Sequence, residues 1–362
     1  MSPSRPKASP RRRRTVAVLG ATGAVGQSFI KLLAGHPWFD LVAVAASERS
    51  AGKSYAEAAR WLGTDPMPDS VASMTVLPCD PKQVDAELVF SALDSSVAGD
   101  AEVAFARAGR FVLSNAKNYR MDPDVPLVIA EVNPEHLDIL ESQQKRRKWS
   151  GGIITNGNCV AIVGALPLAP IHQRFGITKL FASTMQAVSG AGYPGVPSLD
   201  ILGNVIPLIT DEEPKIETEL QKFLGRAVDG VIESAPFVVS SHANRVPVEH
   251  GHTICMSIAF DRKTSAEDVT ACISEWRGSP LAHGLPSAPD RPIVMATSPD
   301  RPQPRLDVNT GRGMSVTVGR IRPDPLFDVR MVVSGHNIIR GAAGASVLNA
   351  ELLVSSGRLG AA

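Results

Sequence analysis

The sequence predicts an α/β protein with an N-terminal Rossmann-type domain followed by an α+β domain. At 362 residues, 44% of them hydrophobic, the chain is long enough to form two cores. In the first half, short apolar runs of strand length end in or near small polar residues, as in parallel sheets that bind ligands. In the second half, residues 253–260 and 315–321 alternate apolar and polar side chains, which is typical of half-buried strands.

Composition excludes several classes of protein. The formal net charge of +1 gives no support for a nucleic-acid partner. The four cysteines lie far apart without a CxxC pair, which argues against a disulfide scaffold or a structural zinc site and suits the cytoplasm. No apolar run approaches the ~20 residues needed to span a membrane. We therefore expect a cytoplasmic protein without a membrane or nucleic-acid partner.

Residues 1–14 are rich in proline and serine and end in the run Arg11–Arg14. The segment has no apolar core, so it is not a secretory signal. We expect a disordered basic tail. A short organelle-targeting or nucleic-acid-binding arm is the alternative.

A phosphate-binding turn follows the tail. Residues 15–19 are an apolar run of strand character, and Gly20–Gly26 reads GATGAVG. Apolar residues at helical spacing come next, from Phe29 to Leu33. Strand, glycine turn and helix in this order favour pyrophosphate binding, because small residues let the backbone approach and the helix start supplies N–H donors. The spacing is GxxGxxG, so the prediction of a dinucleotide site rests on this context.

The second predicted strand, residues 41–46, indicates which dinucleotide binds. NAD enzymes place a lone acidic residue after this strand to bind the ribose hydroxyls. Here Ser47, Arg49 and Ser50 stand instead and are suited to a ribose phosphate, which predicts NADP. Glu48 argues against this interpretation, and a solvated loop is the alternative.

Three further strands are expected in the first half, at residues 88–93, 111–115 and 126–134. Each ends in or near polar residues, where open α/β sheets bind ligands. The charged run 141–148 is more typical of a solvated connector than of a site.

Cys159 lies where a predicted strand, residues 151–155, passes through a turn into an apolar helix beginning near Val160. The turn Asn156–Asn158 consists of residues that tolerate positive φ. A cysteine at a helix start lies near unpaired N–H groups, which favour the thiolate. The alternative is a buried structural cysteine.

Polar residues of the second half also suggest chemistry. Gln186 lies in an apolar strand and needs a partner or a ligand. Arg245 and His252 bracket a turn at a strand edge, where the arginine is suited to a carboxylate and the histidine to a proton. Three histidines lie between positions 242 and 252, but no second cluster completes a metal site. The polar pair His336-Asn337 faces either a ligand or solvent.

Five motifs in this order resemble those of aspartate-β-semialdehyde dehydrogenases, in the form found in archaea and fungi. The resemblance covers nearly everything after Arg14. The motifs are GATGAVG at 20–26, SNAKNYR at 114–120, QAVSGAG at 186–192, RVPVEHGH at 245–252 and HNIIRGAAG at 336–344.

The resemblance implies an NADP-binding domain of residues 15–158 plus 340–362. Residues 159–339 would form a catalytic and dimerisation domain with a mixed sheet, in a homodimer or homotetramer. The implied reaction is the NADPH-dependent reductive dephosphorylation of L-aspartyl-4-phosphate to L-aspartate-4-semialdehyde through a cysteine thioester. This step serves the synthesis of threonine, methionine and, in some organisms, lysine.

The resemblance also implies roles for single residues. Cys159 would be the nucleophile, His252 the general acid/base and Gln186 the residue that positions the acyl group. Substrate binding would fall to Arg245 and Glu212 for the carboxylate and amino group, and to Asn115, Lys117 and Lys215 for the phosphate. NADP binding would fall to Gly20, Thr22, Gly23, Ala24, Val25, Ser47, Arg49, Ser50, Ser189, Gly190 and Asn337.

The sequence departs from the family at the nucleophile. Proline or serine usually stands two residues before the cysteine, and serine or threonine after it. This chain has Gly157 and Val160-Ala161 there, and Ala130 where proline is usual. The departures leave room for reduced activity or a shifted substrate.

Three alternatives stay open. A malonyl-CoA reductase shares the framework and the thioester chemistry but needs no acid for an amino group, so Glu212 distinguishes it. An N-acetylglutamyl-phosphate reductase matches the motifs less well. An NADP-binding regulatory protein that has lost catalysis would explain the unusual residues beside Cys159.

Overall fold

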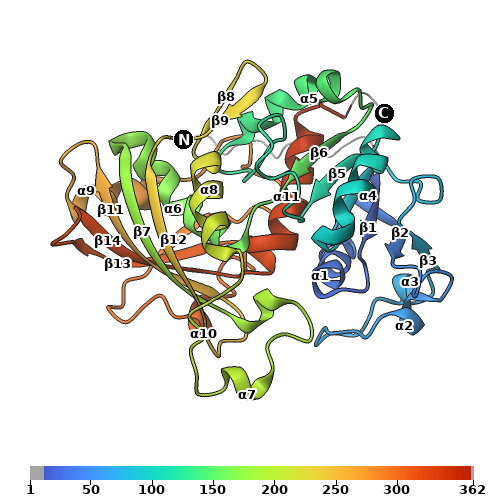
Figure 1. Cartoon of the computed structure of the whole chain (residues 1–362), viewed down its shortest axis with the longest axis horizontal. Coiled ribbons are helices and arrows are strands. Elements are labelled where there is room, and N and C mark those ends of the chain that lie inside the picture. Colours follow the sequence, from blue (N-terminus) through green and yellow to red (C-terminus); the bar gives the residue numbers. More distant parts are fainter. Residues whose placement is uncertain (1–11, 360–362) are drawn as a thin grey trace.

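The computed structural model describes residues 12–359, which form two six-stranded sheets and a two-stranded ribbon. Figure 1 shows the first sheet on the right and the second on the left. The strands of the first sheet are all parallel, in the order β3-β2-β1-β4-β5-β6. This is the strand order of the Rossmann fold. The strands are β1 (Arg14–Leu19), β2 (Phe39–Ala46), β3 (Val76–Pro78), β4 (Leu88–Ser91), β5 (Phe111–Ser114) and β6 (Gly152–Thr155).

Helices cover both faces of the first sheet, as its uninterrupted apolar strands require. Val16 and Val18 of β1 join one core cluster with residues of α1 and α11. Ala17 and Leu19 point the other way and join a cluster with Phe105 of α4. The helices of this part are α1 (Ala24–Leu33), α2 (Tyr55–Ala58), α3 (Asp69–Ala72), α4 (Ser95–Arg107), α5 (Leu140–Arg147) and α11 (Gly344–Ser355).

The second sheet is mixed, as expected, with the order β10-β7-β11-β14-β13-β12. The pairs β10–β7 and β12–β13 are parallel and the other three are antiparallel. Its strands are β7 (Ile177–Gln186), β10 (Val238–Arg245), β11 (His252–Phe260), β12 (Ile293–Met295), β13 (Val316–Pro323) and β14 (Val329–Gly335). The ribbon consists of β8 (Arg226–Val228) and β9 (Val231–Glu233).

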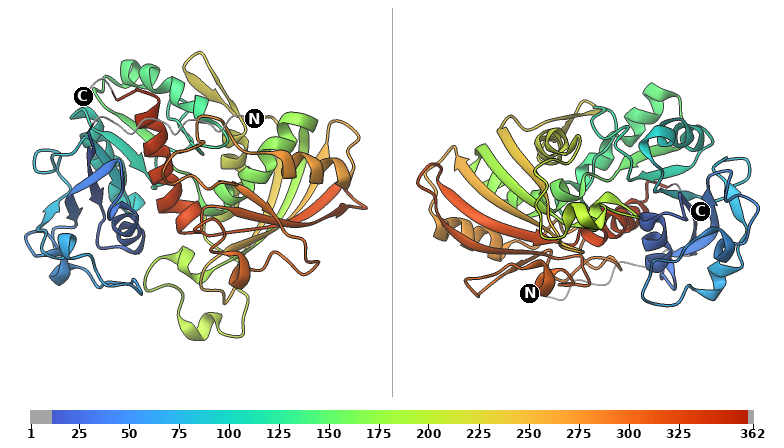
Figure 2. Two further views of the ribbon diagram at one scale, coloured as in Figure 1. Left: turned by 180° about the vertical axis from the view of Figure 1, so that it is seen from behind. Right: turned by 60° about the horizontal axis from the view of Figure 1, so that its bottom comes forward.

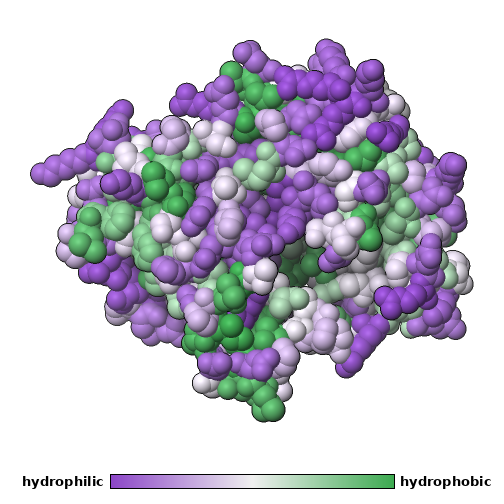
Figure 3. Space-filling view, in the orientation of Figure 1, coloured by the Kyte–Doolittle hydropathy of each residue, from purple (hydrophilic) through white to green (hydrophobic). Residues whose placement is uncertain are grey.

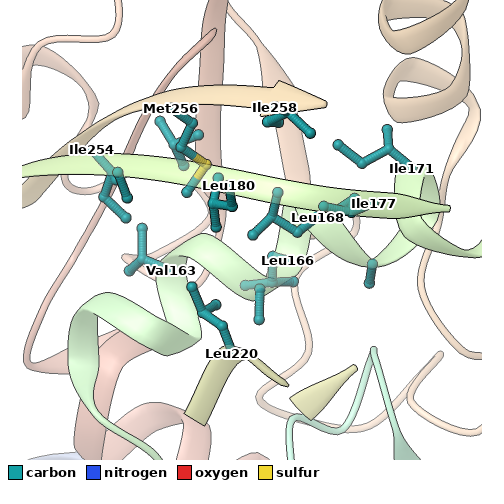
Figure 4. Packing of buried hydrophobic residues seen from close by; sticks show 14 of the residues in the cluster. Val163, Leu166, Leu168, Ile171, Ile177, Leu180, Leu220, Ile254, Met256 and Ile258 are labelled. Carbon is teal, nitrogen blue, oxygen red and sulfur yellow. The ribbon is translucent and has the colours of Figure 1, made fainter. Parts of the chain in front are cut away.

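Helix α6 (Cys159–Phe175) forms the centre of the second core. Figure 4 shows Val163 and Leu166 of α6 near Leu180 of β7 and Ile254 of β11. Helix α8 contributes Leu220 to the same cluster. Almost every side of α6 is therefore buried. Helices α8 (Glu212–Phe223) and α9 (Ala266–Glu275) pack beside it, with the short elements η2 (Val188–Ala191), α7 (Ser198–Ile201), α10 (Pro304–Asp307) and η3 (Ile339–Ala343) elsewhere in this half.

The core that each helix joins supports the domain boundaries that we propose after Asn158 and near Arg340. Helix α6 follows β6 of the first sheet but packs in the second core. Helix α11 follows the second sheet but packs in the first core. Figures 1 and 2 show α11, in red, between the two sheets. The chain thus crosses between the cores at Cys159 and again near residue 340.

A buried ion pair fixes the second crossing. Arg340 is 0% exposed and Glu131 is 2% exposed. Arg340 Nη1 donates to Glu131 Oε2 over 3.1 Å, Nη2 donates to Oε1, and Nε donates to the Met314 carbonyl over 2.6 Å. Ser279 N–H donates to the backbone carbonyl of Glu131 over 2.7 Å. One guanidinium therefore joins segments from both halves of the chain.

The strand expected at residues 126–134 is absent, and this prediction was wrong. Only Leu127 forms an isolated bridge, to Thr155. The Asn133 side chain accepts the Ile129 N–H and donates to the Leu127 carbonyl, so these backbone groups have no need of a neighbouring strand. A 3-10 helix, η1 (Pro134–Ile139), follows.

The expected basic tail lies mostly outside the described residues, which begin at Arg12. The end of the arginine run differs from the expectation, because Arg14 is the first residue of β1. Arg12 and Arg14 both donate to Glu87, and Arg13 pairs with Asp40. These charges therefore contact the first domain. Among residues 12–359, no helix is long and apolar enough to cross a membrane.

The second sheet and the loop around α7 both carry exposed residues. Alternate residues of the second sheet, such as Lys179 and Cys255, are exposed on the face away from α6. The loop around α7 projects from the body at the bottom of Figure 1, and Figure 3 shows it largely green. Leu199 is 91% exposed there, and Leu202 and Leu208 are each 68% exposed.

Candidate active site

A cavity of about 630 Å³ lies where the carboxyl ends of the two sheets meet. Asn115 follows β5, Gln186 ends β7 and Arg245 ends β10, and all three line the cavity. Figure 3 shows this face hollowed between the first domain and the α7 lobe. The position agrees with the rule that open α/β sheets bind ligands at the carboxyl ends of their strands.

Cys159 is the first residue of α6 and lines this cavity, as the sequence predicted for a turn-to-helix junction. Asn158 is the N-cap, and its Oδ1 accepts N–H groups of Val160 and Ala161 over 2.9 and 3.2 Å. The turn does not use a positive φ at Gly157, contrary to expectation. Glycine is required for space instead, because a Cβ at Gly157 would lie 2.3 Å from Phe223 Cζ.

His252 faces the cysteine. Its Nε2 lies 3.0 Å from Cys159 Sγ, and its Nδ1 accepts the Ala187 N–H over 3.0 Å. Because Nδ1 is an acceptor, the neutral ring carries its proton on Nε2, toward the sulfur. Burial lowers the pKa of His252 to about 3, and Arg245 acts in the same direction. His252 is therefore a neutral hydrogen-bond donor to Cys159.

At Cys159 the effect of burial outweighs that of the helix start and favours the protonated thiol. Burial raises the pKa of Cys159 to about 12, and the Glu212 carboxylate also raises it. Arg120 and Arg245 lower it. The Val160 N–H at the start of α6 acts in the same direction as these arginines, although it also donates to Asn158 Oδ1.

The predicted substrate-binding residues surround the sulfur. Arg245 is buried and donates through Nη1 to the Ala187 carbonyl over 2.7 Å. Glu212, the first residue of α8, accepts from Asn158 Nδ2 over 2.8 Å and lies 3.5 Å from Lys215 Nζ. Gln186 is buried, with Nε2 3.3 Å from Thr184 Oγ1. A carboxylate and several cations thus face one cavity.

The predicted phosphate-binding residues Asn115, Lys117 and Lys215 line the same cavity. Asn115 Oδ1 accepts from Asn156 Nδ2 over 2.9 Å, which connects it to the turn before Cys159. Lys117 is exposed and lies 3.1 Å from Asp211. Lys117, Lys215 and Arg245 line the cavity together with Arg120. This positive lining suits a substrate with more than one anionic group.

The glycine turn after β1 has the geometry of a phosphate cradle. A Cβ at Gly20, where φ is +70°, would lie 2.5 Å from the Ala92 carbonyl oxygen. Gly23 is the N-cap of α1 without a side-chain cap, so the first N–H groups of the helix are open to an anion. Ala24 and Val25 of that helix line the cavity, and Thr22 is half-buried beside them.

Ser189 and Gly190 cross over the Cys–His pair. Ser189 Oγ accepts from Asn337 Nδ2 and lies 2.9 Å from His250 Nδ1, while Asn337 Oδ1 accepts the Gly251 N–H. A Cβ at Gly190 would lie 3.0 Å from Arg245 Nη1 and 3.1 Å from His252 Cε1. Both residues and Asn337 line the cavity. The loop therefore needs glycine to approach the reacting groups.

The structure brings most of the predicted residues together. Ser47, Arg49 and Ser50 lie in the turn after β2, outside the cavity lining. Gly20, Thr22 and Gly23 of the glycine turn also lie outside it, as does His252, which contacts Cys159. The predicted residues that line the cavity are Ala24, Val25, Asn115, Lys117, Cys159, Gln186, Ser189, Gly190, Glu212, Lys215, Arg245 and Asn337. In the part of the chain that the structure describes, no group of three histidine, cysteine or acidic residues is placed to hold a metal ion.

Arg120 and Asn158 are polar residues of the lining to which sequence reasoning gave no role. Arg120 closes the motif at 114–120 and lies in the cavity wall. Asn158 both caps α6 and contacts Glu212. An asparagine immediately before an apolar helix is a recognisable N-cap signal, which would have identified the second.

Two family models and several known proteins match most of this chain. The model of the semialdehyde dehydrogenase NAD-binding domain matches residues 15–140, and that of the semialdehyde dehydrogenase dimerisation domain matches residues 168–340. Aspartate-semialdehyde dehydrogenase of Archaeoglobus fulgidus is 52% identical over 94% of this chain and 98% of its own length. That of Schizosaccharomyces pombe is 46% identical over 95% and 99%.

Two solved structures are similar as well. The crystal structure of aspartate-semialdehyde dehydrogenase with NADP from Candida albicans has a TM-score of 0.89 at 44% identity, covering 95% of this chain and 99% of that one. Aspartate-semialdehyde dehydrogenase II complexed with ASA from Vibrio cholerae has a TM-score of 0.74 at 27% identity, covering 95% and 98%.

The contact between Gly157 and Phe223 yields a testable prediction. Gly157→Ala should reduce the free energy of unfolding by about 1–3 kcal/mol, because the new methyl overlaps the phenyl ring. Urea unfolding measures this. The same Gly157→Ala change should cost less stability when it is made in Phe223→Leu than when it is made in the wild-type protein. Wild-type stability in Gly157→Ala would show that the ring does not need this space.

Proposed function

Since this chain belongs to the aspartate-semialdehyde dehydrogenase family, we propose that it reduces L-aspartyl-4-phosphate to L-aspartate-4-semialdehyde with NADPH. The reaction proceeds through a thioester on Cys159 and supplies a precursor of threonine, methionine and, in some organisms, lysine. The observation that carries the proposal is the 3.0 Å contact between Cys159 Sγ and His252 Nε2 in the cavity wall.

Cys159 supplies the nucleophile. Its sulfur attacks the acyl carbon as the thiol proton passes to the departing phosphate. A C–S bond forms, the C–O bond breaks, and phosphate leaves with the electrons of that bond. Bound NADPH would supply the hydride that reduces the thioester. The C–S bond then breaks as the aldehyde forms, and the sulfur leaves as thiolate. Each step generates charge on sulfur or oxygen beside His252.

His252 acts as a hydrogen-bond donor in this scheme. Its Nδ1 accepts the Ala187 N–H, so Nε2–H is directed at the sulfur. This donor stabilises the thiolate and the oxyanion of each tetrahedral intermediate. A free cysteine with a pKa of ~8.5 is only a few per cent thiolate at pH 7, so such stabilisation matters for the rate. The resemblance implied that His252 acts as a general acid/base, and the geometry favours the role in which its Nε2–H is donated.

The lining supports an amino-acid substrate. Arg245 is suited to the α-carboxylate, and Glu212 to the ammonium group. Lys117, Arg120 and Lys215 are suited to the phosphate. A malonyl-CoA reductase has no use for the Glu212 carboxylate, which disfavours that alternative. The full set of polar groups around Cys159 likewise disfavours a regulatory protein without catalysis.

The first domain fits NADP. The open helix start at Gly23 suits a pyrophosphate, and Asn337 and Ser189 line the part of the cavity next to Ala24. Arg49 and its neighbouring serines lie at the end of β2, where the ribose phosphate would bind. This arrangement supports NADP over NAD.

We also propose a homodimer or homotetramer in the cytoplasm. The match to a dimerisation domain and the exposed leucines around α7 support self-association. Cys79, Cys159, Cys255 and Cys272 are all free thiols, which suits a reducing compartment.

Cys159→Ala should abolish turnover of aspartate semialdehyde with NADP and phosphate, because no other nucleophile can form the thioester. NADP binding and the thermal midpoint should stay near wild type. Iodoacetamide should modify wild-type Cys159 in step with inactivation. Cys255→Ala, which removes an exposed thiol on the second sheet, is the control and should keep full activity. Full activity of Cys159→Ala would exclude the thioester mechanism.

Arg49→Ala should raise KM for NADP about tenfold to 150-fold and leave KM for NAD nearly unchanged. The estimate follows from losing one hydrogen bond between charged groups, worth about 1.5–3 kcal/mol. Lys53→Ala removes an exposed cation from the same region and serves as the control. An equal effect of Arg49→Ala on both cofactors would show that Arg49 does not contact the ribose phosphate.

Arg245→Lys tests the substrate class. A lysine cannot make the two parallel hydrogen bonds that a guanidinium makes to a carboxylate. We expect kcat/KM for aspartate semialdehyde to fall about tenfold to 150-fold, with NADP affinity unchanged. An aldehyde without a carboxylate should be affected much less. Wild-type efficiency of Arg245→Lys with aspartate semialdehyde would place the carboxylate elsewhere.

A further inference from the structure

We propose that Glu219 is a positioning residue, which holds the turn before Cys159 and the Arg120 guanidinium in their reactive geometry. It lies on α8 and is 1% exposed. Its Oε2 accepts the backbone N–H of Asn158 over 2.5 Å, and its Oε1 accepts from Arg120 Nη1 over 2.9 Å. The proposal rests on the proposed function, in which Cys159 is the nucleophile.

Charged residues on one face of α8 make hydrogen bonds to loops of the first domain. Glu212, Lys215, Glu219 and Lys222 are spaced by three, four and three residues, which places them on one side of a helix. Lys222 Nζ donates to the carbonyls of Arg120, Asp122 and Val125 over 2.6, 2.7 and 2.9 Å. The same helix therefore forms hydrogen bonds to the loop of residues 120–125 and to the turn before Cys159.

The contact to Asn158 acts directly on the position of Cys159. Glu219 accepts the N–H of Asn158, Glu212 accepts from its side chain, and Phe223 fills the space beside Gly157. The two residues before the nucleophile are thus fixed by one helix. Because Cys159 follows directly, a movement of this turn would change the 3.0 Å distance from Sγ to His252 Nε2.

The contact to Arg120 orients a charge in the cavity. Arg120 donates through Nη1 to Glu219 and through Nη2 to the Asn115 carbonyl over 2.7 Å. Two contacts from one planar group define its orientation. Arg120 is nearly buried and lines the cavity, and its charge lowers the pKa of the Cys159 thiol against the larger effect of burial. Glu219 therefore fixes the position of the turn before Cys159 and the orientation of the Arg120 guanidinium in the cavity wall.

Two substitutions separate the functions of the carboxylate. Glu219→Gln keeps the size and an oxygen acceptor but removes the charge that compensates Arg120. Glu219→Asp keeps the charge and withdraws it by one methylene. Glu217→Gln is the matched control, because Glu217 lies on the same helix and accepts the Ser241 N–H over 3.0 Å but does not line the cavity.

The measurements are kcat, KM, and the rate at which iodoacetamide modifies Cys159 in the absence of substrate. Both Glu219 variants should lower kcat about tenfold to a hundredfold, since small misplacements of reacting groups have effects of this size. The modification rate should fall with kcat, while KM for NADP stays within about twofold because Glu219 lies outside the dinucleotide cradle. Glu217→Gln should keep wild-type values for all three.

Removing a buried charge also lowers stability, so a second control is needed. Val44→Ala truncates the first core away from the cavity, and thermal midpoints are recorded for all variants. The proposal is overturned if a folded Glu219 variant keeps both the wild-type kcat and the wild-type modification rate. It is also overturned if Val44→Ala lowers these quantities as much at an equal loss of thermal midpoint.

The modification rate needs no substrate, so it separates this proposal from the proposed function. If the wild-type protein failed to reduce aspartyl phosphate, a slower modification of Cys159 in the Glu219 variants would still show that Glu219 positions the thiol. An unchanged rate beside normal wild-type catalysis would refute the positioning role alone.

Discussion

The position of the two domains relative to each other depends on the buried ion pair between Arg340 and Glu131. Neither charge reaches solvent, and the Arg340 Nε is also bonded to the Met314 carbonyl. Removing one partner of such a pair typically costs about 3–5 kcal/mol, because the other charge is left uncompensated. The relative position of the two sheets is therefore strongly specified. This position decides how Asn115 and Lys117 of the first domain face Cys159, which belongs to the second core together with the strand that His252 begins.

The site combines neutral reacting groups with charged walls. Burial raises the pKa of Cys159 and lowers that of His252, so the pair carries no net charge before a ligand enters. The cations that line the cavity attract an anionic substrate, and two of them, Arg120 and Arg245, lower the pKa of the Cys159 thiol. The Ala187 N–H holds the His252 ring in the orientation that directs Nε2–H at the sulfur. Charge thus develops where donors are already in place.

The residues beside the nucleophile that depart from the family have physical explanations here. Gly157 leaves the space that the Phe223 ring occupies. Val160 and Ala161 are buried members of the second core, and their N–H groups are satisfied by Asn158 Oδ1. A hydroxyl at either position is therefore not needed to cap α6. Nothing in the structure explains Ala130, which is buried in the first core.

The sequence by itself determined the local elements: the strand, glycine turn and helix from Thr15 to Leu33, the cysteine at a helix start, and the alternating strands of the second half. These depend on periodicity and turn chemistry within a few residues. Only the tertiary structure decided that the Asn133 side chain takes up backbone groups of the preceding segment, which is therefore not a strand. It alone also decided that Cys159 contacts His252, 93 residues away. The tertiary structure also decided that Glu212 and Glu219 of α8 accept hydrogen bonds from Asn158, in the turn before Cys159. Such contacts join distant segments, so no local pattern encodes them.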